Sequence, residues 1–404
     1  MKIGVFSESN QVSIDTVRHY MELGLIIPEK KGGQYFFDQR CQQDLADVIY
    51  FKGLGFTLKE IQSIFSFKRL GRLTPYQQDQ YYRAIFLDKQ EQLKQDLARL
   101  SMTEQRLQKK IEELSKLNNQ EASKMGIRID LLGLFRCCNC AGKLILAEGA
   151  VEDNQLLNGI FQCSCGMEYV IDDGILMVDR FTGEGVEQPE HIIDYINTTS
   201  DEYLDKLYQG LEWTYKKLDF NSLTGKVLLE LGSGFGYFLR HIYQDIPPDT
   251  IYLAVDHDLK KQRFLKRILE GTGLHRQIIF ICSDFRKVPI SEQVVDILID
   301  FSGSSNYSFE HEEFLLEVIE RYTKNDTMLI GSYILFKKFV ENSFIPAKER
   351  KNFQLDFIKG KIQELNYKII EQWISNAVRT GGRYENYFQE GEEEVYSFVL
   401  LAQR

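Results

Sequence analysis

Short apolar runs alternate with longer amphipathic stretches throughout the second half of the chain. Runs of four or five apolar residues bounded by glycines and polar residues are typical of strands buried on both faces of a parallel sheet. The stretches between them show the spacing of helices, and this alternation predicts a parallel, doubly wound α/β sheet with a hairpin-like end. Strands are predicted at 227–231, 251–256, 278–284, 294–301, 327–336, 367–374 and 394–404, and helices at 237–243, 260–270 and 312–322.

A glycine-rich loop follows the first of these strands. Its sequence is VLLELGSGFGYF, with glycines at alternate positions (Gly232, Gly234 and Gly236). Such glycines let a backbone turn tightly where a bound molecule approaches it, at the N-terminus of the following helix. The dinucleotide fingerprint G-x-G-x-x-G is absent because Tyr237 takes its third glycine position, and no Lys follows as in a P-loop.

The pattern E-x-G-x-G-x-G, which begins at Glu230, resembles motif I of the class I S-adenosylmethionine (SAM) methyltransferases. Asp256 ends the next predicted strand, about 20 residues after the loop, where a carboxylate accepts hydrogen bonds from two ribose hydroxyls. The resemblance covers residues 223–404 and implies SAM as cofactor. It further implies that Asp284 pairs with the adenine amino group and that the Phe285 backbone contacts the ring edge. The expected cofactor-binding residues are thus Glu230, Gly232, Gly234, Gly236, Asp256, Asp284 and Phe285.

The catalytic residues stay unknown at this level. The segment DFSGSSNYSF after the fourth strand lacks the N-P-P-[YF] signature of amino-methylating enzymes and the Pro-Cys pair of cytosine C5 enzymes. Four residues in or just after this segment border the expected acceptor site but are equally ordinary loop residues: Asp300, Asn306, Tyr307 and His311. Upstream aromatic residues either line a pocket or simply pack the domain: Tyr195, Tyr203, Trp213 and Tyr215.

The first 70 residues have the pattern of a small helical domain with a β-hairpin. Ser13 is a candidate N-cap for a helix over 14–23, which Gly24 ends. The segment IIPEKKGGQYFF predicts a hairpin wing, because its glycines are flanked by apolar and aromatic residues. A third helix at about 40–54 and a fourth opened by a Thr57–Glu60 capping box complete a winged helix-turn-helix.

The motifs KIG, SIDTVRHYMELGLI-P, G-Y and LGFTLKEIQ, in this order, resemble the MerR family of winged-helix transcription regulators. The resemblance implies binding of double-stranded promoter DNA, with cations on phosphates and helix side chains on base edges. The family usually has Tyr at His19 and Arg at Phe36, so one phosphate contact is expected to be missing. The implied DNA-binding residues are Ser13, Thr16, Arg18, His19, Tyr20, Lys30, Lys31 and Tyr35.

A helical pattern without Gly or Pro then runs from 76 to 119. Apolar residues follow steps of four and three, with Glu104 filling one register position: Leu93, Leu97, Leu100, Leu107, Ile111 and Leu114. A helix packed on its own domain shows similar spacing, but polar residues on the other faces favour a two-stranded coiled coil. MerR-like regulators pair through such a helix, so we expect a homodimer on a pseudo-palindromic site.

Four of the seven cysteines form two close pairs, Cys137-x-x-Cys140 and Cys163-x-Cys165. Two such pairs can complete a tetrahedral zinc site, and reduced structural thiols are the alternative. Cys138 lies inside the first pair, so either Cys137 or Cys138 is the ligand. The stretch CGMEYVIDDGILMV resembles the small zinc ribbons of some SAM methyltransferases. Four cysteines leave no open coordination position, which predicts a structural zinc ion.

Charge is unevenly distributed along the chain. Residues 1–118 carry a net charge of +3 and the remainder −13, so only the first part suits a polyanion. No apolar run approaches the length of a membrane span, and the start lacks a signal-peptide core. We therefore expect a cytoplasmic protein without membrane partners, in which clustered cysteines bind metal rather than form disulfides.

Together these patterns predict a multidomain chain. The expected parts are a winged helix-turn-helix at 1–73, a dimerisation helix at 74–119, a small β zinc ribbon at 130–180 and a Rossmann-like doubly wound α/β methyltransferase domain at 190–404. The principal hypothesis is a DNA-binding regulator whose effector domain binds SAM and methylates or senses a small molecule. The alternative is a small-molecule methyltransferase that regulates its own gene. Methylation of nucleic acid is disfavoured, because the second half is acidic and lacks the amino-methylation signature.

Overall fold

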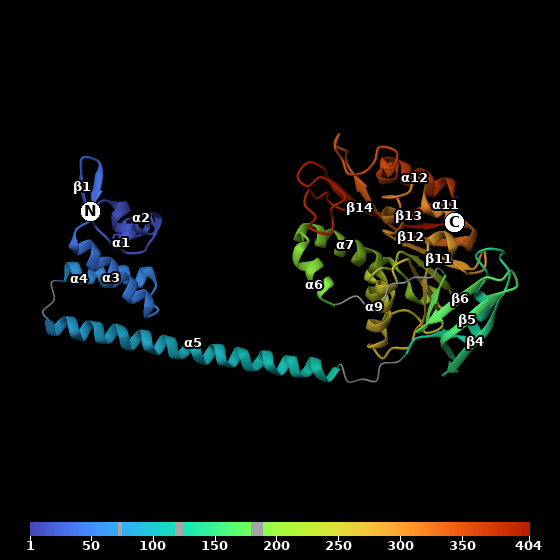
Figure 1. Cartoon of the computed structure of the whole chain (residues 1–404), viewed down its shortest axis with the longest axis horizontal. Coiled ribbons are helices and arrows are strands. Elements are labelled where there is room, and N and C mark those ends of the chain that lie inside the picture. The colour runs from blue at the N-terminus through green and yellow to red at the C-terminus, as the bar shows by residue number, and fades with distance from the viewer. Residues whose placement is uncertain (72–74, 118–123, 179–188) are drawn as a thin grey trace. The chain divides into compact units, whose positions relative to one another are not determined.

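The computed structural model describes residues 1–71, 75–117, 124–178 and 189–404 (Figure 1). The chain divides into two compact units, Met1–Leu117 and Asn118–Arg404. The glycines, acids and proline of residues 181–189 predict a linker, which lies outside the described residues except for Pro189, where a helix begins. In the described ranges, no helix has both the length and the apolar character needed to cross a bilayer.

The first unit contains the winged helix-turn-helix that the sequence predicts. The Ser13 side chain accepts a hydrogen bond from the Thr16 N–H, and the Thr57–Glu60 capping box is present. Gly24 and Gly55, just after the second and third helices, have φ of 67° and 85°, which explains why glycine stands there. The elements are α1 (Ile3–Ser9), α2 (Ile14–Glu22), β1 (Glu29–Lys31), β2 (Gln34–Phe36), α3 (Gln39–Gly53), α4 (Leu58–Leu70) and α5 (Pro75–Leu117).

The long helix α5 is anchored to this domain near its beginning. Tyr82, Ile85 and Phe86 pack against the core of the first unit, and Lys89 forms an ion pair of 2.9 Å with Glu60. Beyond these contacts, the residues of the predicted heptad are exposed in the single chain, by 44% to 67% of their surface. This part of α5 therefore presents an exposed apolar seam.

The second unit is built on a 12-stranded sheet in the order β13-β14-β12-β11-β8-β9-β10-β7-β6-β5-β3, with β4 beside β5. Its strands are β3 (Ile127–Arg128), β4 (Leu144–Glu152), β5 (Gln155–Cys163), β6 (Glu168–Asp172), β7 (Ile175–Met177), β8 (Val227–Leu231), β9 (Ile251–Asp256), β10 (Gln277–Cys282), β11 (Val295–Phe301), β12 (Thr323–Phe336), β13 (Lys368–Ile374) and β14 (Val395–Gln403). Its helices are η1 (Ile129–Leu134), α6 (Pro189–Thr198), α7 (Asp201–Lys217), η2 (Phe220–Leu223), α8 (Tyr237–Ile242), α9 (Leu259–Glu270), η3 (Phe285–Lys287), α10 (Gly303–Tyr307), α11 (Leu315–Ile319), η4 (Glu320–Tyr322), η5 (Arg350–Phe353) and α12 (Leu355–Glu364).

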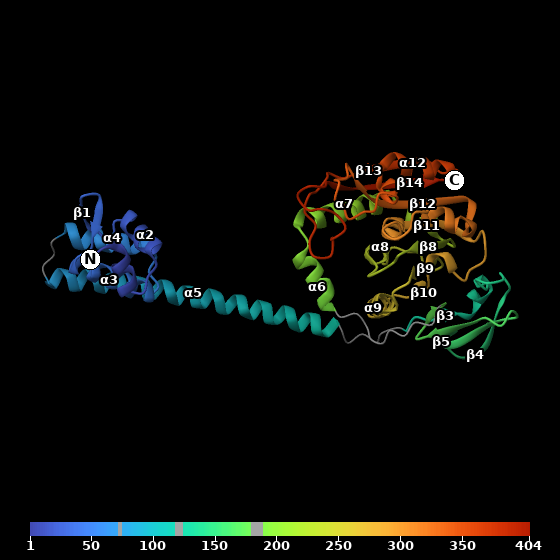
Figure 2. The same ribbon diagram turned by 45° about the horizontal axis from the view of Figure 1, so that its top comes forward.

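The centre of this sheet is parallel and doubly wound, as predicted. Strands β7, β10, β9, β8, β11 and β12 run parallel, and β14 lies antiparallel between β12 and β13 (Figure 2). The chain steps outward from β8 through β9 to β10 and then returns to β11, so the order reverses beside β8. In sheets of this type, ligands bind at the carboxyl ends of the strands at that reversal.

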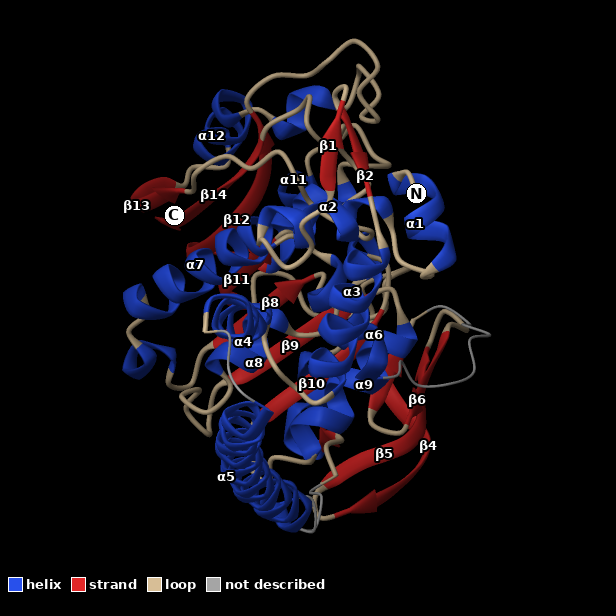
Figure 3. Cartoon of the chain, turned by 90° about the vertical axis from the view of Figure 1, so that its left-hand side faces the viewer, coloured by secondary structure: helices blue, strands red, loops and turns tan. Residues whose placement is uncertain are grey.

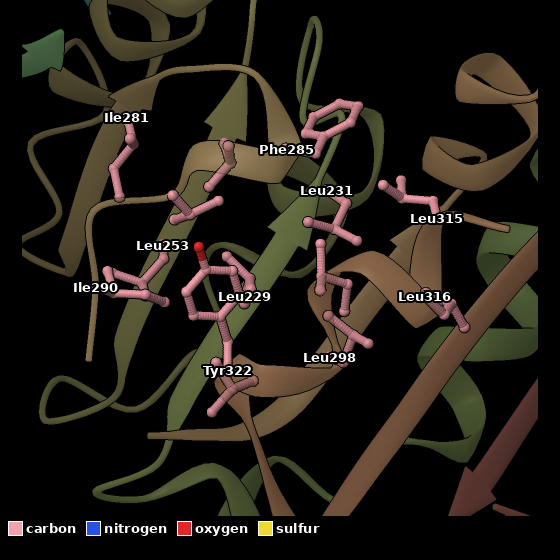
Figure 4. Close-up of a cluster of buried hydrophobic side chains, with 14 of the residues drawn as sticks. Leu229, Leu231, Leu253, Ile281, Phe285, Ile290, Leu298, Leu315, Leu316 and Tyr322 are labelled. Atoms are coloured by element: carbon pink, nitrogen blue, oxygen red, sulfur yellow. The ribbon is translucent and has the colours of Figure 1, made fainter. Parts of the chain in front are cut away.

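Alternate residues of the central strands fill two apolar layers. On β8, Leu229 and Leu231 face the layer that contains α11 and α12, whereas Leu228 faces α8 and α9. Figure 4 shows the first layer, in which Leu229 and Leu231 lie among Leu253, Leu298 and other side chains, with Phe285 at its end. The glycine loop is thus held by a strand that is buried on both faces.

The cysteine-rich segment extends the same sheet. Strands β4, β5 and β6 form an antiparallel group (Figure 3). Strand β7 pairs antiparallel with β6 and parallel with β10, which joins this group to the α/β part. The cysteine segment and the α/β part therefore share one compact unit.

Two predicted elements differ in the structure. The helix expected at 312–322 is wrong in its extent, since α11 begins at Leu315 and passes into the 3₁₀ turn η4. The short helix α10 after β11 was not predicted. There the Asp300 carboxylate accepts a hydrogen bond from the Ser304 N–H at 2.7 Å, which stabilises a first turn that apolar spacing does not reveal.

Candidate functional sites

The glycine loop forms a sharp bend between β8 and α8. Gly234 and Gly236 have φ of 49° and 74°, a backbone region that other residues rarely adopt. A Cβ on Gly236 would lie 2.2 Å from a Leu265 methyl, so this glycine is needed for packing. A Cβ on Gly234 would meet no atom closer than 3.8 Å, and Gly232 lies beside Phe285. The loop therefore leaves space at Gly234 for close approach of a ligand.

Asp256 lies against this loop. One carboxylate oxygen accepts the Gly234 N–H at 2.8 Å and the other accepts the Asp258 N–H at 2.8 Å. The side chain is nearly buried, and His257 Nδ1 lies 3.7 Å from it. An ionised carboxylate has about four lone-pair positions, so each oxygen can still accept one further hydrogen bond. Asp256 thus braces the loop and retains acceptor capacity for two ribose hydroxyls.

Asp284 lies just beyond β10, where it begins the turn η3. The Arg286 guanidinium donates to both of its oxygens, at 2.6 to 3.1 Å, and holds the pKa of this carboxyl below its usual range. The neighbouring Phe285 ring is buried near Gly232. The predicted adenine-contacting pair therefore lies beside the loop, with the Asp284 carboxylate partly engaged by Arg286.

Glu230 lies near the carboxyl end of β8, and the charge of Asp256 acts on it. It shares a face with Leu228 because side chains alternate along a strand, and its carboxyl accepts a hydrogen bond from the Tyr252 hydroxyl at 2.9 Å. Complete burial raises the pKa of Glu230 to about 8. The protonated form is therefore favoured near neutral pH, within the apolar layer that contains Leu228.

The glycine backbone and the Asp256 carboxylate fit the polar groups of SAM in their chemistry. No atom lies closer than 3.8 Å to a Cβ built on Gly234, and Asp256 retains acceptor capacity at the end of β9. Both oxygens of Asp284, after β10, accept hydrogen bonds from Arg286. SAM supplies a methyl group on a sulfonium, for which the protein needs to provide orientation. In that role Gly232 and Gly234 would let the cofactor lie directly against the backbone of the loop, and Asp256 and Asp284 would hold the nucleoside.

Five tyrosines, which we call the tyrosine cap, gather near the loop from three segments: Tyr195, Tyr203, Tyr237, Tyr384 and Tyr387. Tyr237 directly follows Gly236, and its ring centroid lies 6.1 Å from that of Tyr195. The Tyr195 hydroxyl donates to Glu385 at 2.7 Å. The sequence analysis singles out only Tyr195 and Tyr203 as aromatic candidates. Tyr237 begins α8, and Tyr384 and Tyr387 come from the segment between β13 and β14.

The remaining aromatic and acceptor-site candidates lie elsewhere or are engaged. Trp213 packs in the layer of α8 and α9, and Tyr215 bonds Asp245. Asp300 is fully buried, which raises its pKa to about 6. Tyr307 stacks on His311 with ring centroids 4.0 Å apart, whereas Asn306 is exposed. None of these contacts identifies a catalytic base.

The four predicted zinc ligands meet in one cluster. The sulfur atoms of Cys137, Cys140, Cys163 and Cys165 all lie within 4.8 Å of one another. Tetrahedral coordination with Zn–S bonds of about 2.3 Å requires sulfur separations of about 3.8 Å. The separations are 3.6 Å for Cys137–Cys165 and 3.4 Å for Cys140–Cys163, so the residues fit zinc.

The immediate surroundings of this cluster distinguish Cys137 from Cys138. Burial opposes ionisation of Cys137, but hydrogen bonds from Tyr169 and backbone N–H groups lower its pKa to about 6. The Cys138 thiol instead donates to the Lys287 carbonyl at 2.9 Å. Cys137 therefore belongs to the cluster, and Cys138 contacts the turn that follows Phe285.

The predicted DNA-binding residues lie on α2, its N-cap and the wing. Arg18 and His19 are exposed beside Asp15 and Glu22, respectively. On the wing, Lys31 pairs with Glu29 at 2.8 Å, and Lys30 lies 5.5 Å from the Tyr35 ring centroid. Ser13 and Thr16 form the N-cap of α2. Tyr20 differs, since its ring is 96% buried and supports the helix from the core.

Residues 1–68 match the family described as "MerR HTH family regulatory protein". They form a MerR-type DNA-binding domain. The chain has no match among curated proteins.

Several solved structures are similar to parts of the chain. A SAM-dependent methyltransferase from Geobacter sulfurreducens in complex with S-adenosyl-L-homocysteine is 13% identical over 55% of this chain and 100% of its own, with a TM-score of 0.39. One from Thiobacillus denitrificans, also with S-adenosyl-L-homocysteine, is 16% identical over 48% and 91%, with a TM-score of 0.36. One from Aquifex aeolicus is 16% identical over 54% and 99%, with a TM-score of 0.34.

Proposed function

We propose that this protein is a dimeric, DNA-binding transcription regulator whose second unit binds SAM and methylates or senses a small molecule. The observation that carries the effector role is the glycine loop at the carboxyl end of β8, where no atom lies closer than 3.8 Å to a Cβ built on Gly234 and Asp256 accepts the Gly234 N–H. A helix N-terminus and flanking acids suit the polar groups of a nucleoside and an amino acid.

The test of this role is SAM binding to the full-length protein, measured by calorimetry. We expect Gly234→Ala to lower the affinity for SAM at least about tenfold, because the new methyl group occupies the space that the cofactor needs. Gly360→Ala is the control, since its Cβ would meet no atom within 4 Å and its helical backbone tolerates alanine. Absence of micromolar SAM binding to the wild-type protein would refute the proposal.

The DNA-binding role is tested with a duplex selected by the wild-type protein from a random library. Arg18 is exposed on α2, so Arg18→Ala should weaken binding and reduce the slope of its salt dependence by roughly 0.9, the value for one lost phosphate contact. Arg99→Ala, on the exposed surface of α5, is the control. Equal effects of the two substitutions would remove α2 from the proposed interface.

A second candidate function, a small-molecule methyltransferase that controls its own gene, is favoured by the tyrosine cap beside the loop. Formation of S-adenosylhomocysteine with candidate acceptors supports this enzyme. SAM binding without turnover, together with a SAM-dependent change in DNA affinity, supports the sensor. For the cysteine cluster we propose a structural zinc ion, held by Cys137, Cys140, Cys163 and Cys165.

A further inference from the structure

The tyrosine cap is fixed in place by contacts between α6, α7 and the segment that links β13 to β14. The Tyr203 and Tyr387 hydroxyls bond each other at 2.5 Å, and the Tyr384 hydroxyl donates to Asp194 at 2.5 Å. The Ser200 N–H donates to the Gly381 carbonyl at 2.6 Å. These contacts join two segments about 190 residues apart into one wall beside the glycine loop.

One carboxylate, that of Glu385, stands among these rings. It accepts the Tyr195 hydroxyl, and its charge also acts on Tyr203, Tyr237 and Tyr387. Asp194, in contrast, lies 3.5 Å from the Arg383 guanidinium. Within the described ranges, no Lys, Arg or His lies at ion-pair distance from Glu385. Among the described residues, Glu385 therefore forms no ion pair, and Lys206 is a cation on which its charge acts.

The faces of the tyrosine rings add to this negative character. Tyr195 lies between Tyr237 and Tyr384, with centroid distances of 6.1 and 5.8 Å. Aromatic faces carry partial negative charge and attract ammonium groups, most strongly where water is excluded. A carboxylate combined with several ring faces is the chemical arrangement that binds organic cations.

The side-chain amine of Lys206 already lies against one of these tyrosine rings, but it does not cancel the charge of Glu385. Its Nζ lies 3.8 Å from the Tyr203 ring centroid, is buried and has no hydrogen-bond partner. Burial lowers the pKa of Lys206 to about 7, although the Glu385 charge opposes this. At and above neutral pH, much of the Lys206 population is therefore uncharged, and the charge of Glu385 is available to a ligand.

We propose that the tyrosine cap and Glu385 bind an organic cation, either a protonated or a methylated amine, next to the glycine loop. This inference rests on the proposed function and deepens it by naming the chemical class of the small molecule. Since Tyr237 directly follows Gly236, the cation would lie beside the cofactor loop. A neutral ligand of the same shape would lose the attraction to both Glu385 and the rings.

The experiment compares choline with 3,3-dimethylbutan-1-ol, its uncharged isostere, by calorimetry on the full-length protein with and without SAM. We expect choline to bind at least about tenfold more tightly than the isostere, and Glu385→Gln to remove most of this difference. Glutamine keeps an oxygen that accepts the Tyr195 hydroxyl. Glu392→Gln, on an exposed residue of the same segment, should leave choline binding unchanged.

Equal affinity for choline and the isostere, choline binding unchanged in Glu385→Gln, or no choline binding up to about 10 mM would overturn the inference. Tyr237→Leu, at a ring that is 42% exposed, gives a second variant if Glu385→Gln fails to fold. SAM binding is measured in parallel. Glu385-dependent choline binding without SAM binding would refute the cofactor proposal alone, and SAM binding without choline binding would refute this inference alone.

Discussion

The buried hydroxyl of Tyr169 donates a hydrogen bond to the sulfur of Cys137, 3.2 Å away. The same hydroxyl accepts the Cys138 N–H at 2.8 Å, so it orients the first cysteine pair through both a side chain and the backbone. Such support of a metal ligand typically changes metal affinity by roughly 10- to 100-fold. We therefore predict that Tyr169→Phe lowers the affinity of the protein for zinc by about this factor, measured by competition with a chromophoric chelator. Tyr208→Phe, on an exposed tyrosine, is the control, and equal zinc affinity in both variants would contradict the prediction.

The two adjacent cysteines, Cys137 and Cys138, should respond differently to substitution. Cys137 lies in the sulfur cluster, whereas the Cys138 thiol contacts the Lys287 carbonyl. Cys137→Ser should reduce the zinc content well below one ion per chain, and Cys138→Ser should leave it at one, as measured by elemental analysis of the purified protein. The reverse result would assign the ligand to Cys138.

The raised pKa of Glu230 predicts that the stability of the folded protein depends on pH. Its folded pKa of about 8 lies above the ordinary value of 4.5 for an exposed glutamate. The unfolded chain therefore binds fewer protons between these values, so the free energy of unfolding falls as pH rises from about 4.5 through 8, by at most about 1.4 kcal/mol per unit. Glu230→Gln, which cannot ionise, should lack this contribution and lose less stability than the wild type between pH 6 and 8.5 in urea unfolding. Equal losses would show that Glu230 is already ionised in the folded protein.

The behaviour of Glu230 also shows what the sequence does and does not determine. Strand alternation places it on the face of Leu228, and the apolar runs predict β8, β9, β10, β11 and β12, but not β7. The spacing of the cysteines likewise predicts a cluster that the folded chain assembles. These features depend on neighbours within a few residues, which is why a single sequence reveals them.

The cap depends on contacts that no local spacing encodes. Glu385 and Tyr195 are 190 residues apart, and they meet because β14 inserts between β12 and β13 and leaves a long connecting segment beside α6. The pairing of Asp284 with Arg286 and the contact of Cys138 with Lys287 also depend on side-chain directions in turns. Such directions follow from tertiary packing rather than from periodicity.

Helix α5 predicts the oligomeric state. Its heptad residues are exposed in the single chain, among them Leu100 with 61% of its surface accessible. Burial of a leucine contributes about 1.5–3 kcal/mol, and a two-fold pair buries it twice, so Leu100→Glu should raise the dimer dissociation constant at least about 100-fold. Sedimentation of the full-length protein measures this change. Gln105→Glu, off the heptad seam, is the control, and a wild-type protein that sediments as a monomer would remove the dimer from the proposal.

Lys206 connects the tyrosine cap to pH. Its amine faces the Tyr203 ring and the Glu385 charge, while Glu202 and Asp205 lie on the outer side of the same helix. Below its pKa of about 7, the protonated amine repels a cation in the cap; above it, this repulsion disappears. The charge of choline does not titrate, and burial raises the pKa of both Tyr203 and Tyr387 well above 10, so neither hydroxyl ionises in this range. Choline should therefore bind several-fold more tightly at pH 8 than at pH 6, up to about tenfold.

Lys206→Met should remove most of this difference in choline affinity, whereas Lys216→Met, on the exposed face of α7, should preserve it. Calorimetry at the two pH values tests this, and an undiminished pH dependence in Lys206→Met would show that another group controls access to the cap.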